Sequence, residues 1–179
     1  MFKKQTDNRV AVFFADGCEE IEGLTVVDLL FRAGIPCDMV SVSGSYQVTS
    51  SHEVTFLCNK LISEVDINAY AMLVLPGGIP GTPNLAATDT LMQAVDTFAA
   101  QEQPLAAICA APSIYAERGL LSGVRATANP GFQHVLVEKG ALLSKDPVVV
   151  DGPFITSQGA GTAVAFGLEI VRYFLGDAA

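Results

Sequence analysis

The stretch Pro104-Leu-Ala-Ala-Ile-Cys-Ala-Ala-Pro112 decides the fold, because it places a cysteine where a buried strand meets a helix. Leu105 to Ile108 is a short apolar run typical of a buried strand, and Pro112 suits the first turn of a helix. Cys109 is therefore predicted to stand on a sharp strand-to-helix turn, like the nucleophile of many hydrolases. The positive end of the helix would favour a thiolate there. A buried cysteine acting as a small hydrophobic side chain is the alternative.

Strand-like and helix-like segments alternate on both sides of this turn, a pattern that predicts an α/β protein with a mostly parallel sheet. We expect strands over residues 10–15, 35–42, 71–75, 105–108, 125–128, 148–150 and 154–156, and helices over 20–33, 89–100 and 162–175. Gly34 is placed to end the first helix in a left-handed cap. Residues 46–55 are predicted to form a hairpin off the main sheet. The chain, residues 1–179, is expected to form a single domain.

The composition restricts the classes of partner. A net charge of −9 at pH 7 without a cluster of Lys or Arg argues against binding to nucleic acid or to an acidic membrane surface. The apolar runs are shorter than the roughly 20 residues that a membrane span needs. Residues 1–9 are not followed by the long apolar segment of a secretory signal.

The cysteine and histidine content bears on metals, cofactors and compartment. The chain has four cysteines without CxxC spacing and only two histidines, so neither the spacing nor the ligand supply of a zinc site is present. No phosphate-cradling loop rich in Ser and Thr follows the first strand, and we expect neither a flavin nor another cofactor. A reduced cytoplasmic protein with free thiols fits this content best.

Three segments are expected to meet at one edge of the sheet, because the carboxyl ends of parallel strands lie together. They are residues 16–22, the pair Gly77 and Gly78, and Cys109. The two glycines follow a strand directly. Their backbone N–H groups, together with that of Ala110, are suited to form an oxyanion hole beside the thiol. A glycine turn that serves only to reverse the chain is the alternative.

Glu19, Glu20 and Glu22 lie in the first turns of the predicted helix over 20–33. Acidic residues suit that position because of the helix dipole, so two of the three are expected to be structural. Glu22 is predicted to turn inward, where burial against the thiolate would raise its pKa and fit it to move a proton. No histidine directly follows Cys109 and no His-x-Glu pair lies downstream, which gives little support to a papain-like or amidotransferase-like triad.

Four motifs, in this order along the chain, resemble the ThiJ/PfpI superfamily. They are Glu19-Glu20-Ile21-Glu22, Leu75-Pro76-Gly77-Gly78, Ala107-Ile108-Cys109-Ala110-Ala111-Pro112 and Thr156-Ser157-Gln158-Gly159-Ala160-Gly161-Thr162. The similarity covers residues 9–175 and looks best to the branch of bacterial YajL and the human parkinsonism-associated deglycase. It implies a flavodoxin-like three-layer sandwich, usually a homodimer, with a reactive Cys109 beside a protonated Glu22. The implied oxyanion-type donors are the backbone N–H groups of Gly78 and Ala110.

The sequence departs from the family pattern in three places. Asn129 stands where many relatives carry a histidine, and an amide can orient a substrate oxygen but does not shuttle a proton at neutral pH. Ala110 stands where protease-type members have a histidine, which argues against peptide cleavage. Relatives in this branch usually extend past the last helix, so one C-terminal helix is expected to be absent and the cleft to be more open.

Four further residues have both functional and structural interpretations. Cys18 is either a second thiol activated by the helix dipole or a cysteine that merely precedes a helix. His52 stands where relatives have an arginine of an anion-binding pocket across the dimer, or else it is a solvated loop residue. Cys37 is expected in the core, and Cys58 in a loop or at a sheet edge. Cys18 and His52 join Gly77 and Asn129 as candidate substrate-binding residues.

Two functions follow from the resemblance and the site chemistry. In the first, the protein acts on small reactive carbonyls such as methylglyoxal or its early protein adducts, with Cys109 as nucleophile. In the second, it is an oxidation sensor or a redox-regulated chaperone, whose Cys109 is oxidised to a sulfinate stabilised by Glu22. The expected partners are therefore small carbonyls or oxidants. A flavodoxin-like binding module with an inert cysteine is a third interpretation.

Overall fold

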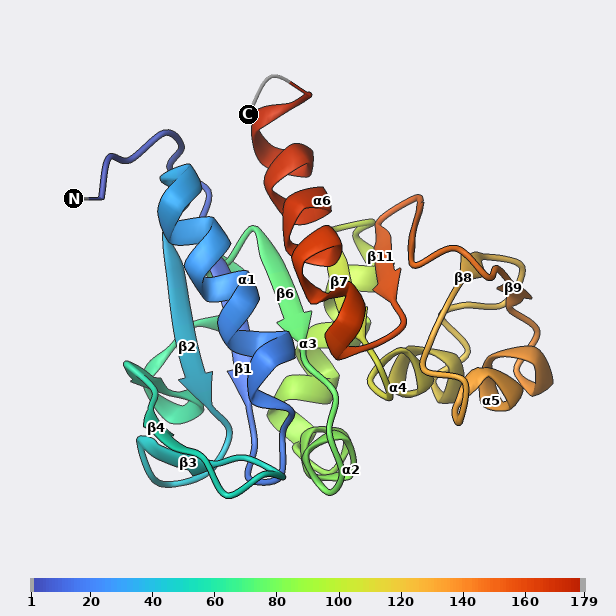
Figure 1. Cartoon of the computed structure of the whole chain (residues 1–179), viewed down its shortest axis with the longest axis horizontal. Coiled ribbons are helices and arrows are strands. Elements are labelled where there is room, and N and C mark those ends of the chain that lie inside the picture. Colours follow the sequence, from blue (N-terminus) through green and yellow to red (C-terminus); the bar gives the residue numbers. More distant parts are fainter. Residues whose placement is uncertain (1, 178–179) are drawn as a thin grey trace.

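The computed structural model describes residues 2–177 and has a seven-stranded sheet at its centre (Figure 1). Its strands, in spatial order, are β10 (Val148–Asp151), β11 (Phe154–Ser157), β7 (Leu105–Ile108), β6 (Met72–Leu75), β1 (Val10–Phe14), β2 (Cys37–Ser41) and β5 (Lys60–Leu61). Neighbouring strands run parallel except for β10, which pairs antiparallel with β11. The predicted mostly parallel α/β sheet is confirmed.

Helices cover both faces of the sheet. The helices α1 (Glu20–Ala33) and α6 (Ala163–Leu175) lie side by side on one face, as Figure 1 shows. The other helices, which pack into the core on the opposite face, are α2 (Gly81–Ala86), α3 (Asp89–Ala100), α4 (Pro112–Glu117) and α5 (Gln133–Glu138). This arrangement is the three-layer, flavodoxin-like sandwich that the family resemblance implies.

Strand β1 shows why the layers form. It is a run of five buried apolar residues, and successive side chains of a strand point to opposite faces. Phe13 joins the cluster that includes α3, whereas Phe14 joins the cluster of α1 and α6. A strand that is apolar on both faces is stable only between two layers, which is the usual situation in parallel sheets.

Smaller elements lie outside the main sheet. A hairpin off the main sheet is found as β3 (Gln47–Thr49) and β4 (Thr55–Leu57), with its second strand running past the predicted range 46–55. A second pair is formed by β8 (Arg125–Ala126) and β9 (Leu142–Leu143). Three 3-10 helices are η1 (Ile62–Glu64), η2 (Ile67–Ala69) and η3 (Ala160–Thr162). Gly34 ends α1 with φ 73°, the left-handed cap predicted for it. Among the described residues, no helix has the length and apolar character needed to cross a bilayer.

The strand order marks one edge of the sheet as the expected place for a site. Strand β1 lies between β2 and β6, and the chain leaves β1 toward α1 on one face but leaves β6 toward α2 and α3 on the other. Loops that diverge in this way open a gap at the carboxyl ends of the strands, which is where α/β proteins place their sites. The loops after β1, β6 and β7 meet here.

Candidate active site

Cys109 lies on the predicted sharp turn between β7 and α4. Its φ is 65°, in the left-handed region that a non-glycine residue seldom adopts. Two hydrogen bonds hold the turn: the Cys109 N–H donates to the Ser157 carbonyl at 2.9 Å, and the Asn129 N–H donates to the Cys109 carbonyl at 2.8 Å. A strained backbone held from both sides is typical of a functional position. The structure therefore confirms the geometry of the elbow.

Glu22 reaches the thiol from the first turn of α1. Its side chain is buried, with 1 % of the residue exposed, and the neighbouring Cys109 thiol lowers the pKa of its carboxyl. The Gly77 N–H donates to Glu22 Oε2 at 2.9 Å. A Cβ at Gly77 would lie 2.6 Å from the Cys109 Cβ and 2.7 Å from Glu22 Oε2, so only glycine leaves room for this approach. Glu22 turns inward, as the sequence predicts.

Two backbone N–H groups point at the sulfur. They belong to Gly78 and Ala110, and both lie close enough to the sulfur to lower the pKa of the Cys109 thiol. Gly78 has φ 93°, and a Cβ there would lie 2.3 Å from the Glu19 nitrogen. The loop therefore needs glycine to bring its N–H group to the thiol. Two convergent donors beside a nucleophile form the arrangement that stabilises an oxyanion.

The thiol and the carboxyl strongly affect each other's protonation. Burial raises the pKa of Glu22 to about 7, and the nearby charge of Glu19 also raises it. Burial and the Glu22 charge raise the pKa of the Cys109 thiol to about 12, against the lowering effect of the Ala110 and Gly78 N–H groups. The expectation that the helix end favours a thiolate is therefore contradicted, because burial, the larger cause, and the Glu22 charge outweigh the two N–H groups. Protonation of Glu22 removes the repulsion between its charge and a Cys109 thiolate. The pair therefore carries one negative charge more readily than two.

Asn129 and Gly159 border the same space. Asn129 Oδ1 accepts from the Gly131 N–H at 3.0 Å, which fixes the amide. A Cβ built at Gly159 would lie 3.7 Å from Asn129 Nδ2, 3.7 Å from Glu22 Oε1 and 3.9 Å from Cys109 Sγ. The structure thus brings Asn129 to the site and adds Gly159, which sequence reasoning did not assign. Its glycine-rich motif after the last strand was the available signal.

The other three cysteines lie outside this cluster. Cys18 is fully buried just before α1, and burial raises the pKa of its thiol to about 12, which contradicts the activated-thiol interpretation and supports the structural one. Cys58 follows β4 in a loop but is 5 % exposed and belongs to the core, where burial raises its pKa to about 12. Cys37, expected in the core, is half-buried at the start of β2.

His52 lies against the start of α1. Its imidazole is 61 % exposed, and Nδ1 lies 3.1 Å from Glu20 Oε2 and 3.7 Å from Glu19 Oε1. The hydrogen bond to Glu20 raises the pKa of His52. Within residues 2–177 these three side chains are the group whose donor atoms are close enough to hold a metal ion. They already pair with one another, which accounts for their proximity without a cation.

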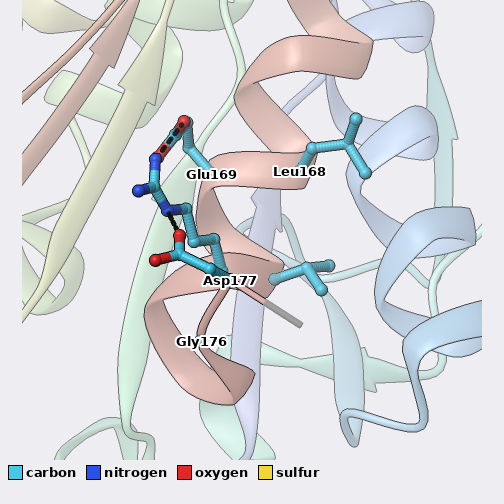
Figure 2. A pocket seen from close by; sticks show the side chains of 6 residues that line it. Leu168, Glu169, Gly176 and Asp177 are labelled. Atoms are coloured by element: carbon cyan, nitrogen blue, oxygen red, sulfur yellow. Dashed lines mark hydrogen bonds and ion pairs between the residues drawn. The ribbon is translucent and has the colours of Figure 1, made fainter. Parts of the chain in front are cut away.

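A hollow lies along the C-terminal part of α6, away from the Cys109 cluster (Figure 2). It holds about 410 Å³ and is lined by Leu168, Glu169, Val171, Arg172, Gly176 and Asp177. Arg172 is engaged there by both Glu169 and Asp177. Because α6 has 13 residues, its two ends are about 20 Å apart. This hollow is therefore not continuous with the Cys109 cluster, which borders the helix start.

Comparisons with known proteins agree with this geometry. The model of the DJ-1/PfpI family matches residues 8–173. Protein DJ-1 homolog B of Arabidopsis thaliana is 36 % identical over 94 % of this chain, which spans 38 % of that protein. The glutathione-independent glyoxalase DJ-1 of Schizosaccharomyces pombe is 31 % identical over 92 % of this chain and 90 % of its own. The solved structure of oxidized Toxoplasma gondii DJ-1 matches with a TM-score of 0.90 and 31 % identity, covering 96 % of this chain and 92 % of its own.

Proposed function

This chain belongs to the DJ-1/PfpI family, and we propose that it converts small reactive carbonyls such as methylglyoxal by means of Cys109. One observation carries the proposal: a buried carboxyl, Glu22, and the Cys109 thiol lie together against Gly77, beside the backbone N–H groups of Gly78 and Ala110. The name of the fission-yeast relative, a glutathione-independent glyoxalase, supports the same substrate class.

The first step is addition of the Cys109 sulfur to the aldehyde carbon. The C–S bond forms as the carbonyl π bond breaks, and the negative charge moves to the oxygen. The N–H groups of Gly78 and Ala110 are placed to stabilise that oxygen. With Glu22 protonated, the thiol loses its proton to solvent without a second charge beside it, and the carboxyl can give its own proton to the oxygen. The product is a hemithioacetal.

The second step moves a proton between neighbouring carbons. The Glu22 carboxylate takes the proton from the carbon bonded to sulfur while the ketone oxygen gains a proton from solvent, forming an enediol. Glu22 then returns its proton to the adjacent carbon as the hydroxyl on the sulfur-bound carbon releases its own to solvent. The sulfur-bound carbon becomes a thioester, which water hydrolyses to lactate and free Cys109. Methylglyoxal plus water equals lactate plus a proton, so the reaction needs no external oxidant or reductant. Burial gives Glu22 a pKa of about 7, which suits a group that both donates and accepts a proton near neutral pH.

Lactate formation from methylglyoxal tests the proposal. Wild type should form lactate, and the rate of lactate formation by Cys109→Ala should be lower by a factor of at least about 100. Cys58→Ala serves as the matched control, because Cys58 is a buried thiol outside the cluster. Retention of the wild-type rate by Cys109→Ala, or no turnover by folded wild type, would contradict the assignment.

A second candidate function is oxidation sensing, which two observations favour. Protonated Glu22 is placed to donate a hydrogen bond to an oxygen on the sulfur, and a structural relative is described as oxidized. Peroxide supplies the oxidant: two equivalents convert the thiol to a sulfinate and are reduced to water. Mass spectrometry after mild peroxide should show two oxygens added at Cys109 and fewer in Glu22→Ala. Equal oxidation of both proteins would refute a stabilising role for Glu22.

We also propose that the protein is a homodimer that associates through α1 and α6. Several apolar side chains on these adjacent helices are about half exposed, among them Ile21 at 52 %, Val164 at 58 % and Leu168 at 51 %. An exposed apolar face of this kind is typical of an interaction surface. Light scattering of wild type should give the mass of two chains, and Ile21→Glu should give that of one. A monomeric wild type would exclude the dimer.

A further inference from the structure

Glu19 joins the two halves of the Cys109 site. It is the N-cap of α1, where its Oε2 accepts from the Glu22 N–H at 2.9 Å. Its own backbone N–H donates to the Gly77 carbonyl at 2.9 Å. The same residue therefore holds the helix that carries Glu22 and the loop that carries the Gly78 donor.

The bond to Gly77 fixes the direction of the Gly78 N–H group. The Gly77 carbonyl and the Gly78 N–H belong to one planar trans peptide, so they point in opposite directions. Because the carbonyl points at Glu19, the N–H must point away from it, toward the Cys109 sulfur. Gly78 also packs against the backbone of residues 17–19, which leaves that peptide little room to rotate.

The carboxylate of Glu19 is itself held in place. It is 11 % exposed, and its second oxygen, Oε1, lies 3.7 Å from His52 Nδ1 in the loop between β3 and β4. One oxygen thus caps α1 while the other faces the hairpin. The capping bond also fixes the backbone of Glu19, because an N-cap residue adopts an extended conformation just before the helix, here φ −89° and ψ 114°.

We propose that Glu19 is a positioning residue, whose side chain ties the start of α1 to the Gly77–Gly78 loop and so holds Glu22 and the Gly78 N–H group against Cys109. This inference rests on the proposed function only for the reaction that Glu22, the Gly78 N–H group and Cys109 carry out. It adds a residue that contacts neither the sulfur nor a substrate carbon.

The charge of Glu19 provides a measurement that separates this role from simple helix capping. The titratable groups that face Glu22 are the Cys109 thiol and Glu19, and Glu19 in turn faces His52. The Glu19 charge raises the pKa of Glu22, so its removal should ease the formation of negative charge on the Glu22–Cys109 pair. Glu20 neighbours Glu19 in sequence, but its carboxylate pairs with His52 and, unlike that of Glu19, does not accept from the Glu22 N–H.

The test compares Glu19→Gln, Glu19→Ala and the control Glu20→Gln with wild type. The rate of Cys109 alkylation by iodoacetamide is measured from pH 5 to pH 9, and lactate formation is measured beside it. Glutamine keeps a capping oxygen but removes the charge, so Glu19→Gln should lower the midpoint pH of alkylation by about half a unit. Glu19→Ala also loses the cap, and its lactate formation should fall by about tenfold to a hundredfold.

The outcomes are distinguishable. A midpoint in Glu19→Gln no lower than that of Glu20→Gln, with both proteins folded by circular dichroism, would overturn the inference. So would a folded Glu19→Ala with the wild-type rate of lactate formation. If Glu19→Ala does not fold, the midpoint of Glu19→Gln decides. Should wild type form no lactate, the proposed function fails while the alkylation profiles still test the role of Glu19.

Discussion

Gly77→Ala adds a single methyl group at the centre of the cluster. That methyl carbon would lie 2.6 Å from the Cys109 Cβ, 2.7 Å from Glu22 Oε2 and 3.0 Å from the Ile108 carbonyl. Ordinary contacts between carbon atoms begin near 3.5 Å, so about 1 Å of movement is required. The Glu22 side chain can swing away, but it then loses the hydrogen bond from the Gly77 N–H. The turn at Cys109 has no such freedom, because Ser157 and Asn129 hold its backbone.

The size of the effect follows from these distances. Overpacking of this kind costs about 1 to 3 kcal/mol, and for a chain of this size 2 kcal/mol corresponds to about 4 to 8 °C in Tm. A displacement of about 1 Å between reacting groups costs about a hundredfold in rate. Gly161→Ala is the matched control, since a Cβ there meets no atom within 4 Å.

Thermal unfolding, Cys109 alkylation and lactate formation together measure this prediction. Gly77→Ala should lose both stability and reactivity, whereas Gly161→Ala should stay within about 0.5 kcal/mol of wild type. A Gly77→Ala protein with the wild-type Tm and reactivity within threefold of wild type would refute the packing argument.

Three further predictions concern single side chains. Burial raises the pKa of Glu22 from its ordinary 4.5 to about 7, so the folded state binds more protons than the unfolded chain between these values and wild-type stability falls as pH rises through them. That 2.5-unit difference corresponds to about 3 kcal/mol. In urea unfolding, the free energy of unfolding of Glu22→Gln minus that of wild type should therefore increase by this amount between pH 4 and pH 8. A difference that does not change with pH would contradict this. Tyr70 donates to buried Asp38 at 3.0 Å, and Tyr70→Phe should cost about 1 to 2 kcal/mol in urea unfolding, with no loss counting against the bond. Asn129→Asp keeps an acceptor for the local turn but adds a negative charge near Cys109, so the alkylation midpoint should rise by about half a pH unit. An unchanged or lower midpoint would show that this side chain does not act on the thiol.

Periodicity in the sequence was enough to predict the large elements. The helix over 89–100 has apolar residues at helical spacing, and α3 occupies that range. The strand over 105–108 is likewise found as β7. Helices α2 and α5 have six residues each, less than two turns, so no periodic signal marks them. Strands β5 and β9 have two residues each and form only because a neighbouring strand is already in place.

The members of the candidate site were predictable because strand ends fix where the loops meet. The inward turn of Glu22 and the donors Gly78 and Ala110 follow from this rule and from the family resemblance. The protonation of Cys109 was not predictable, because the balance between the backbone N–H groups and burial depends on three-dimensional distances. The same limit applies to Cys18, whose position before a helix suggested activation although the core encloses its thiol.

The central claim is that a thiol and a carboxyl act together in carbonyl chemistry. Its most direct test is lactate formation from methylglyoxal by Glu22→Gln, in protein whose Cys109 still reacts with iodoacetamide. Glutamine can fill the space of Glu22 but cannot accept the proton on carbon, so the rate should fall by about a thousandfold. A rate within tenfold of wild type would contradict the claim.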